Sequence, residues 1–119
     1  DTDAGGVVFY ANYLKFFERA RTEWLRGLGV GQQDLKERTG AIFVVGETRV
    51  GYLRPARLDD VLEITVRLVH CGKASLDLRQ QAFRDGELVA EGDIRIGCVD
   101  ALTLRPRRMP ATLLEHLHA

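Results

Sequence analysis

The sequence contains few of the residues on which several enzyme classes depend. Its 119 residues include one serine, Ser75, and no Gly-x-Ser-x-Gly motif surrounds it, which argues against a serine hydrolase. The three histidines have no His-x-x-x-His spacing, so they do not predict a zinc site. Gly29-Val30-Gly31 lacks the third glycine and the lysine of nucleotide-binding loops. These patterns therefore give no support to zinc or nucleotide chemistry.

The chain also lacks an excess of charge and any long apolar run. Lys and Arg together number 17, as do Asp and Glu, so the formal net charge is +0 and a general nucleic-acid or anionic-membrane binder is not expected. The longest apolar run, 41–45, is far shorter than the roughly 20 residues that span a membrane. Cys71 and Cys98 are not in a metal-binding or redox spacing, which predicts two free thiols in a reducing cytoplasm.

The apolar pattern that is present predicts one long helix followed by strands. Residues 12–28 form a wide apolar stripe at helical spacing, with Asn12 as the expected N-cap and glycines 27, 29 and 31 ending the helix. A second short helix is expected over 32–38, and another over 111–118. The helical stripe carries Tyr13, Leu14, Phe16, Phe17, Ala20, Trp24, Leu25 and Leu28.

Four segments between these helices have the character of strands. They cover residues 42–53, 61–70, 75–84 and 87–100, and Asp85-Gly86 is a hairpin turn signal between the last two. Leu62, Ile64, Val66 and Leu68 share one face of the second segment, and Leu88, Ala90, Ile94, Ile96 and Cys98 share one face of the last. One long helix with four antiparallel strands predicts an α+β domain in which a sheet wraps the helix.

Chemistry is concentrated in residues 1–13, where two carboxylates and two glycines lead into the long helix. A helix N-terminus offers unpaired N–H groups and partial positive charge, so a carbonyl placed there would be polarised. Judged on these residue types alone, an ordinary capping loop is the favoured interpretation, because Asp and Gly are common in loops.

A resemblance changes that balance. The run 1–21, DTDAGGVVFYANYLKFFERAR, resembles the 4-hydroxybenzoyl-CoA thioesterase-like branch of the hotdog fold, and most of all the Tol-Pal-associated acyl-CoA thioesterases. The likeness continues through 52–60 and reaches Val99-Asp100 and Arg105-Pro106, so it covers nearly the whole chain. It implies a single hotdog domain over 1–119, a long helix wrapped by a curved antiparallel β-sheet. It also implies that the family's N-terminal strand is missing here.

The resemblance assigns roles to individual residues. Asp3 matches the catalytic aspartate, which either attacks the thioester or activates a water, and Gly6 matches the glycine of the turn. Tyr10 falls where an aromatic residue points its backbone N–H at the thioester carbonyl, although the Tol-Pal branch usually has His there. Lys73 and Arg105 match positions that contact the CoA nucleotide. Arg54 and Arg57 are further possible contacts.

Two other acidic sites receive structural interpretations. Glu18 is the alternative catalytic acid, but its charged helical neighbours favour a solvated ion pair. Asp59-Asp60 also matches the family, and its context favours a turn that begins a strand.

The expected function is therefore a cytoplasmic acyl-CoA thioesterase that uses neither a metal nor a cofactor. An acyl-carrier-protein thioester is an alternative substrate, and a non-catalytic acyl-binding module is the rival from another class. The resemblance implies a homodimer or homotetramer. The sequence leaves open the acyl chain length, the preference for aromatic or aliphatic acyl groups, and the choice between nucleophile and general base for Asp3.

Overall fold

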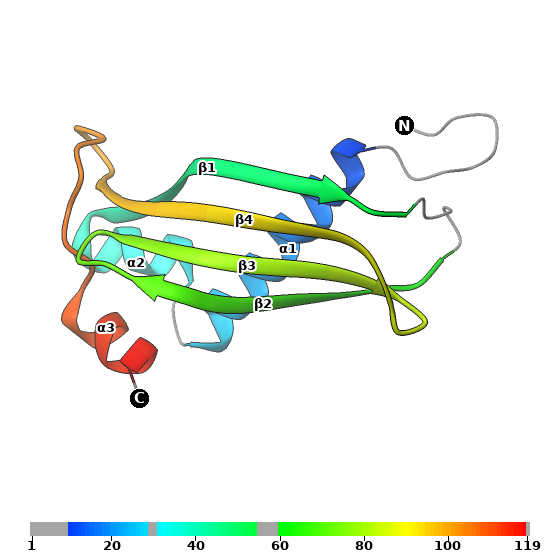
Figure 1. Ribbon diagram of the computed structural model, residues 1–119. Coiled ribbons are helices and arrows are strands. Elements are labelled where there is room, and N and C mark those ends of the chain that lie inside the picture. Colours follow the sequence, from blue (N-terminus) through cyan, green and yellow to red (C-terminus); the bar gives the residue numbers. More distant parts are fainter. Residues whose placement is uncertain (1–9, 29–30, 55–59, 119) are drawn as a thin grey trace.

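The computed structural model describes residues 10–28, 31–54 and 60–118 (Figure 1). Seven helices and strands follow one another along this part of the chain. They are α1 (Tyr10–Gly27), α2 (Gln32–Thr39), β1 (Ala41–Tyr52), β2 (Leu62–Cys71), β3 (Ser75–Arg84), β4 (Glu87–Asp100) and α3 (Ala111–His118). Each lies within one or two residues of its predicted position, so the predicted order of elements is confirmed.

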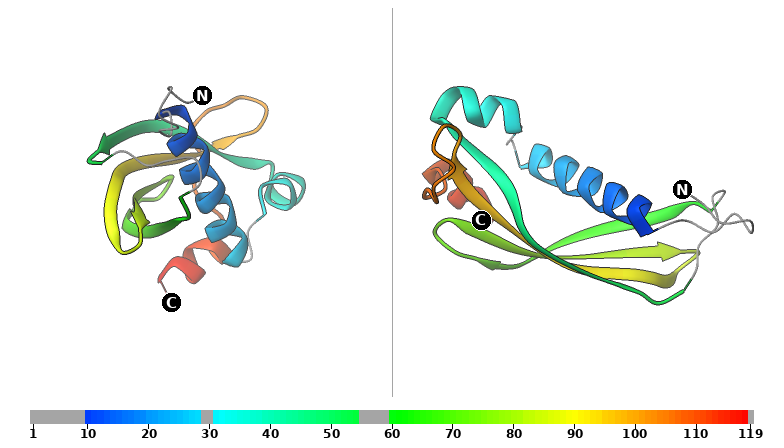
Figure 2. Two further views of the ribbon diagram at one scale, coloured as in Figure 1. Left: turned by 90° about the vertical axis from the view of Figure 1, so that its right-hand side faces the viewer. Right: turned by 90° about the horizontal axis from the view of Figure 1, so that it is seen from above.

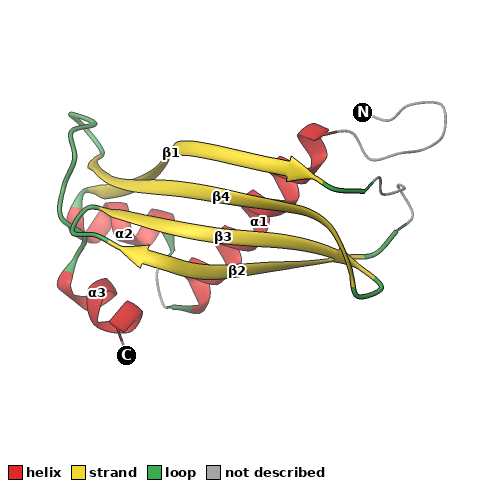
Figure 3. Ribbon diagram, viewed as in Figure 1, coloured by secondary structure: helices red, strands yellow, loops and turns green. Residues whose placement is uncertain are grey.

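The four strands form one antiparallel sheet in the order β1-β4-β3-β2. The sheet is twisted and curved, and α1 lies across its concave face (Figure 2). The helices α2 and α3 lie near the end of the sheet where β1 begins and β2 ends (Figure 3). The predicted α+β arrangement, a long helix against a curved antiparallel sheet, is therefore confirmed.

The apolar face of α1 explains why the helix follows the sheet. Tyr13 and Phe17, in its first half, are buried against Ala82, Val89 and Ala90. Leu25, near its end, belongs to a second cluster of buried residues at the other end of the sheet. That cluster includes Phe43, Leu76, Leu78, Ile94 and Ile96. Burial of a side chain of this size contributes about 1.5–3 kcal/mol, so α1 is held along most of its length.

The predicted alternation of the strands is confirmed with one exception. Leu62, Ile64, Val66 and Leu68 of β2 all pack on the side of the sheet that carries the core. The register between β3 and β4 shifts between Ala82 and Phe83. As a result Val89 of β4 is fully buried, whereas Leu88 was the residue expected to be buried. A bulge of this kind re-aims side chains without leaving a clear signal in the alternating pattern.

The predicted turn at the hairpin is confirmed, and the predicted N-cap of α1 is wrong. Asp85 and Gly86 have φ values of 50° and 80°, the left-handed pair that a tight hairpin requires. Asn12 was expected to cap α1, but the helix already begins at Tyr10, so Asn12 lies within its first turn. Because Asn is acceptable in a first turn as well as at a cap, its presence fixed the start only to within a few residues.

Two sequence-based expectations concern thiols and membranes. Cys71 is partly buried and Cys98 is fully buried, both are free thiols, and burial raises the pKa of each. In the described ranges, no helix is long and apolar enough to cross a membrane.

Candidate active site

The first residue of α1 lies at the end of the sheet that carries the β3–β4 hairpin. Tyr13, one turn later, packs beside Ala90, and its ring centroid lies 5.4 Å from that of Tyr52 at the end of β1. Tyr10 is thus placed at the N-terminus of α1, as the resemblance implied. Asp3 and Gly6 lie outside the described residues.

The N-terminus of α1 has the electrostatic character that a carbonyl-polarising site needs. The first amides of a helix have no partner within the helix, and the helix dipole places partial positive charge there. The first turn of α1 contains no acidic residue that would neutralise this charge. A carbonyl or carboxylate oxygen near Tyr10 would therefore be stabilised by backbone groups alone.

Lys73 and Arg105 both lie near the end of the sheet opposite Tyr10 (Figure 1). The Met109 N–H donates to the Lys73 carbonyl over 2.9 Å, and the Asp100 N–H donates to the Arg105 carbonyl over 2.9 Å. The first bond holds Met109 against the turn between β2 and β3, and the second holds Arg105 against the end of β4. The two predicted nucleotide contacts, both among the described residues, therefore lie at the same end of the sheet, away from Tyr10, and no contact between them is seen.

A third basic residue joins this region, one that sequence reasoning missed. Arg108 is exposed beside Met109, whereas its neighbour Arg107 pairs with Asp100 at 3.5 Å. Within the described part of the chain, the side chains of Lys73, Arg105 and Arg108 make no hydrogen bond or ion pair. The run Arg105-Pro106-Arg107-Arg108 indicates a basic segment in the sequence, but it does not reveal which arginine forms an ion pair with an acidic residue.

Arg54, a weaker candidate, is exposed and lies 3.5 Å from the Glu87 carboxylate; Arg57 lies outside the described residues. Asp60 forms an ion pair, which fits the structural role predicted from its sequence context. Its carboxylate pairs with Arg84 at 3.3 Å, and Arg84 also contacts Glu87 at 2.9 Å. These contacts tie the start of β2 to the hairpin, which explains Asp60 without a catalytic role; Asp59 lies outside the described residues.

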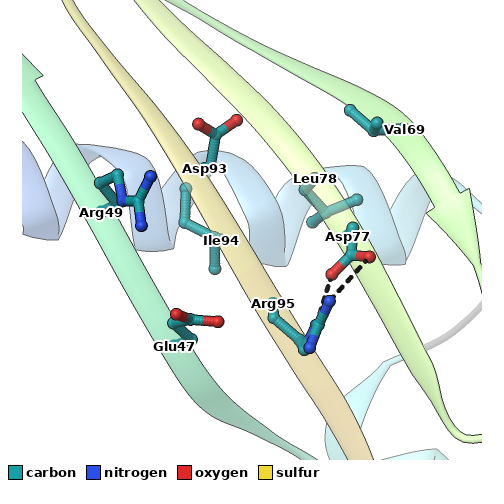
Figure 4. A pocket seen from close by; sticks show the side chains of 8 residues that line it. All are labelled: Glu47, Arg49, Val69, Asp77, Leu78, Asp93, Ile94 and Arg95. Carbon is teal, nitrogen blue, oxygen red and sulfur yellow. Dashed lines mark hydrogen bonds and ion pairs between the residues drawn. The ribbon is translucent and has the colours of Figure 1, made fainter.

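The outer face of the sheet has a hollow of about 210 Å³ whose lining includes charged side chains from β1, β3 and β4, with Asp77 and Arg95 paired (Figure 4). Arg95 contacts Asp77 at 2.7 Å, and its hydrogen bonds hold the pKa of that carboxyl below its usual value. Arg79 contacts Asp93 at 3.1 Å in the neighbouring row. Opposite charges that alternate across exposed strands describe a solvated face, so this hollow is a poor candidate for an acyl group.

A second pocket, of about 280 Å³, lies between α1 and β1. Glu18, Arg21 and Thr22 contribute its polar lining, and apolar side chains form its other walls. Glu18 is exposed and makes no ion pair among the described residues, so its predicted ion pair is not present there. The alternative acid is therefore accessible, but it lies two turns along α1 from the helix N-terminus.

A long helix lying on a curved antiparallel sheet is the hotdog arrangement that the resemblance implied (Figure 2). Comparison with known proteins agrees with this class. The family model of the thioesterase-like superfamily matches residues 1–117, and the chain belongs to that superfamily.

Two relatives that match nearly the whole chain are named as acyl-CoA thioesterases. The chain is 43% identical over 115 residues to the acyl-CoA thioester hydrolase YbgC of Escherichia coli O157:H7, covering 96% of this chain and 85% of the relative. It is 37% identical over 118 residues to the acyl-CoA thioesterase YbgC of Haemophilus influenzae, covering 99% and 87%.

Solved structures give the same result for the fold. A probable thioesterase from Bartonella henselae superimposes with a TM-score of 0.84 at 32% identity, over 92% of this chain and 90% of that one. A hypothetical protein from Thermus thermophilus superimposes with a TM-score of 0.89 at 32% identity, over 98% and 88%. The prediction of a hotdog-fold thioesterase relative is confirmed.

Proposed function

We propose that this protein is a cytoplasmic acyl-CoA thioesterase that hydrolyses R–CO–S–CoA to a carboxylic acid and free CoA. The observation that carries the proposal is the position of Tyr10. The amide end of α1 begins directly after the Asp3–Gly6 motif, in a chain that belongs to the thioesterase-like superfamily. Both observations support a site at this end of the helix, and the chemistry proposed for it below uses no metal or prosthetic group.

The backbone and one carboxylate supply that chemistry. The thioester carbonyl oxygen accepts a hydrogen bond from the Tyr10 N–H, so the negative charge that develops on attack is stabilised at the helix N-terminus. Asp3 either removes a proton from the attacking water or attacks the carbonyl carbon itself. In both routes the C–S bond breaks and CoA leaves as its thiol after taking up a proton. In the second route the acyl group is left on Asp3 as a mixed anhydride, which a water then hydrolyses to release the carboxylic acid and restore the Asp3 carboxylate. Gly6 gives the turn before α1 the freedom to bring Asp3 to the carbonyl.

The acidic side chain is tested by replacing Asp3 with Asn beside a matched Glu18→Gln control. Asp3→Asn keeps shape and hydrogen-bonding capacity but removes both the base and the nucleophile. We expect kcat to fall by about a hundredfold or more, with a smaller change in KM and an unchanged melting temperature. Glu18→Gln should keep most of the activity. A folded Asp3→Asn protein that turns over thioesters near the wild-type rate would show that Asp3 is not the catalytic acid.

Recognition of CoA is assigned to Lys73 and Arg105, to which the structure adds Arg108. Their unpaired charges supply a local attraction for phosphates in a chain that has no net charge. The same charges also suit the acidic surface of an acyl carrier protein, so both carriers belong in any substrate panel. A non-catalytic acyl-binding module would bind such thioesters without releasing a thiol.

This recognition predicts a KM effect that depends on the nucleotide. Lys73→Ala, Arg105→Ala and Arg108→Ala should each raise KM for a full CoA thioester and leave kcat nearly unchanged, and added salt should have the same effect. For a thioester that lacks the nucleotide, the variants should match the wild type. Arg67→Ala, on the outer face of the sheet, is the control. Unchanged KM in all three variants would rule out this assignment.

A second copy of the chain is the proposed partner. The α1 N-terminus and the three free cations lie at opposite ends of the sheet, so one copy alone does not gather the proposed site. The edge strand β1 exposes Val44 and Val45 to 38% and 51%, and Leu14 of α1 is 44% exposed. An unpaired strand edge with exposed apolar side chains invites pairing with a like edge.

Light scattering tests this assembly. The wild type should have the mass of a dimer or tetramer of the 13.4 kDa chain at micromolar concentration. Val45→Lys should shift the mass toward the monomer, because it places a charge in the pairing edge. Leu102→Lys, which changes a 94% exposed residue outside the strands, should leave the mass unchanged. A monomeric wild type would contradict the proposal.

A further inference from the structure

The pocket between α1 and β1 is a mixed environment rather than a plain apolar groove. Leu25, Phe43 and Ile96 are buried core residues that form part of its wall. Among the residues that the structure describes, Arg21 is the one cationic side chain that lines it. A guanidinium that borders an apolar wall is held there at a cost in hydration, so its position calls for an explanation.

A buried amide sets the position of Arg21. Its Nη1 donates to the Gln80 Oε1 over 2.8 Å, and the Gln80 Nε2 donates to the Phe17 carbonyl over 2.9 Å. Gln80 is 0% exposed and is the buried polar residue of the described core. Both ends of its amide are therefore used, one to grip the backbone of α1 and the other to hold the Arg21 guanidinium.

Arg21 keeps donors that nothing in the described part of the chain uses. A guanidinium carries several N–H donors, and only the bond to Gln80 is made there. Burial lowers the pKa of Arg21, and the nearby Glu18 carboxylate partly offsets this, although the two side chains form no ion pair. Arg21 remains charged at neutral pH because an arginine pKa starts far above that range.

The position of the pocket along α1 separates it from the thioester. Tyr10 and Glu18 are eight residues apart (18 − 10 = 8), which is roughly 12 Å along a helix. A carbonyl at the helix N-terminus therefore cannot also occupy the pocket. A substrate whose carbonyl lies at this helix end could reach the pocket only with a part far from the reacting bond.

We propose that the α1–β1 pocket receives the distal end of the acyl group, and that Arg21, positioned by Gln80, selects acyl groups with a hydrogen-bond-accepting oxygen there. The inference rests on the proposed thioesterase function. Leu25, Phe43 and Ile96 would contact the hydrocarbon part, and the free donors of Arg21 would meet the oxygen. Arg21 is then a specificity residue and Gln80 a positioning residue.

The test is a selectivity ratio measured on matched substrates. Three CoA thioesters of equal chain length are compared: a plain acyl group, one with a terminal hydroxyl and one with a terminal carboxylate. We expect wild-type kcat/KM to favour at least one oxygenated substrate over the plain one by about tenfold or more, the range of a hydrogen bond to a charged group. Arg21→Met keeps an apolar stem without donors, and it should abolish the preference while keeping kcat/KM for the plain substrate.

Two further variants separate selectivity from stability. Arg19→Met changes an exposed arginine of the same helix that does not line the pocket, and it should keep the wild-type ratio. Gln80→Leu should reduce the ratio because Arg21 is no longer held; if this variant fails to fold, Arg21→Met still decides. Equal loss of activity on all three substrates in Arg21→Met would assign it a structural role and overturn the inference. An active wild type without an oxygen preference would also overturn it, whereas release of no thiol from any substrate would contradict the thioesterase proposal itself.

Discussion

Among the described residues, the hydrogen bonds of the Gln80 side chain give a directional contact to the largely apolar interface between α1 and the sheet. Apolar packing of Tyr13, Phe17 and Leu25 holds the helix against the sheet, but such packing tolerates small shifts along the axis. The Gln80 amide, fully buried on β3, donates to the Phe17 carbonyl and accepts from Arg21 one turn later. A slide or rotation of α1 would leave this amide unsatisfied at a cost of about 1–3 kcal/mol. The proposed functions of both halves of the helix depend on this fixed position.

That constraint links the two ends of the helix. The first half presents backbone amides at Tyr10, and the second half lines the α1–β1 pocket through Arg21. The same anchoring therefore fixes both proposed positions, that of the thioester carbonyl and that of the distal acyl group. The free cations Lys73, Arg105 and Arg108 are positioned separately, by backbone bonds between the 105–109 segment and the neighbouring strands and turn. A second copy of the chain is the simplest way to combine these regions into one site.

Most of the fold could be predicted from the sequence because its elements are strongly periodic. The alternation in β2 and the Asp85-Gly86 turn each depend on local chemistry, and both are confirmed. The bulge that buries Val89 and the helix start at Tyr10 were missed, because several neighbouring residues satisfy the same local rules.

The site was predictable only in part, since much of it depends on contacts between distant segments. Tyr10 is the first residue of α1, two residues before the expected start of the helix, and the roles of Asp3, Gly6 and Tyr10 stay predictions. The contact between Arg21 and Gln80 joins residues 59 positions apart, so no local pattern could reveal it. Arg108 was missed because the ion pair of its neighbour Arg107 with Asp100 is likewise set by the tertiary structure.

The most direct test of the central claim, that the amide end of α1 polarises the thioester carbonyl, compares Tyr10→Pro with Tyr10→Phe. Proline removes the backbone N–H at a position where helices tolerate it, whereas phenylalanine keeps the N–H and the ring. Thiol release from a CoA thioester should fall by about a hundredfold or more in kcat for Tyr10→Pro and remain near the wild-type rate for Tyr10→Phe, with similar melting temperatures. A folded Tyr10→Pro protein with wild-type turnover, or a comparable loss in Tyr10→Phe, would contradict the claim.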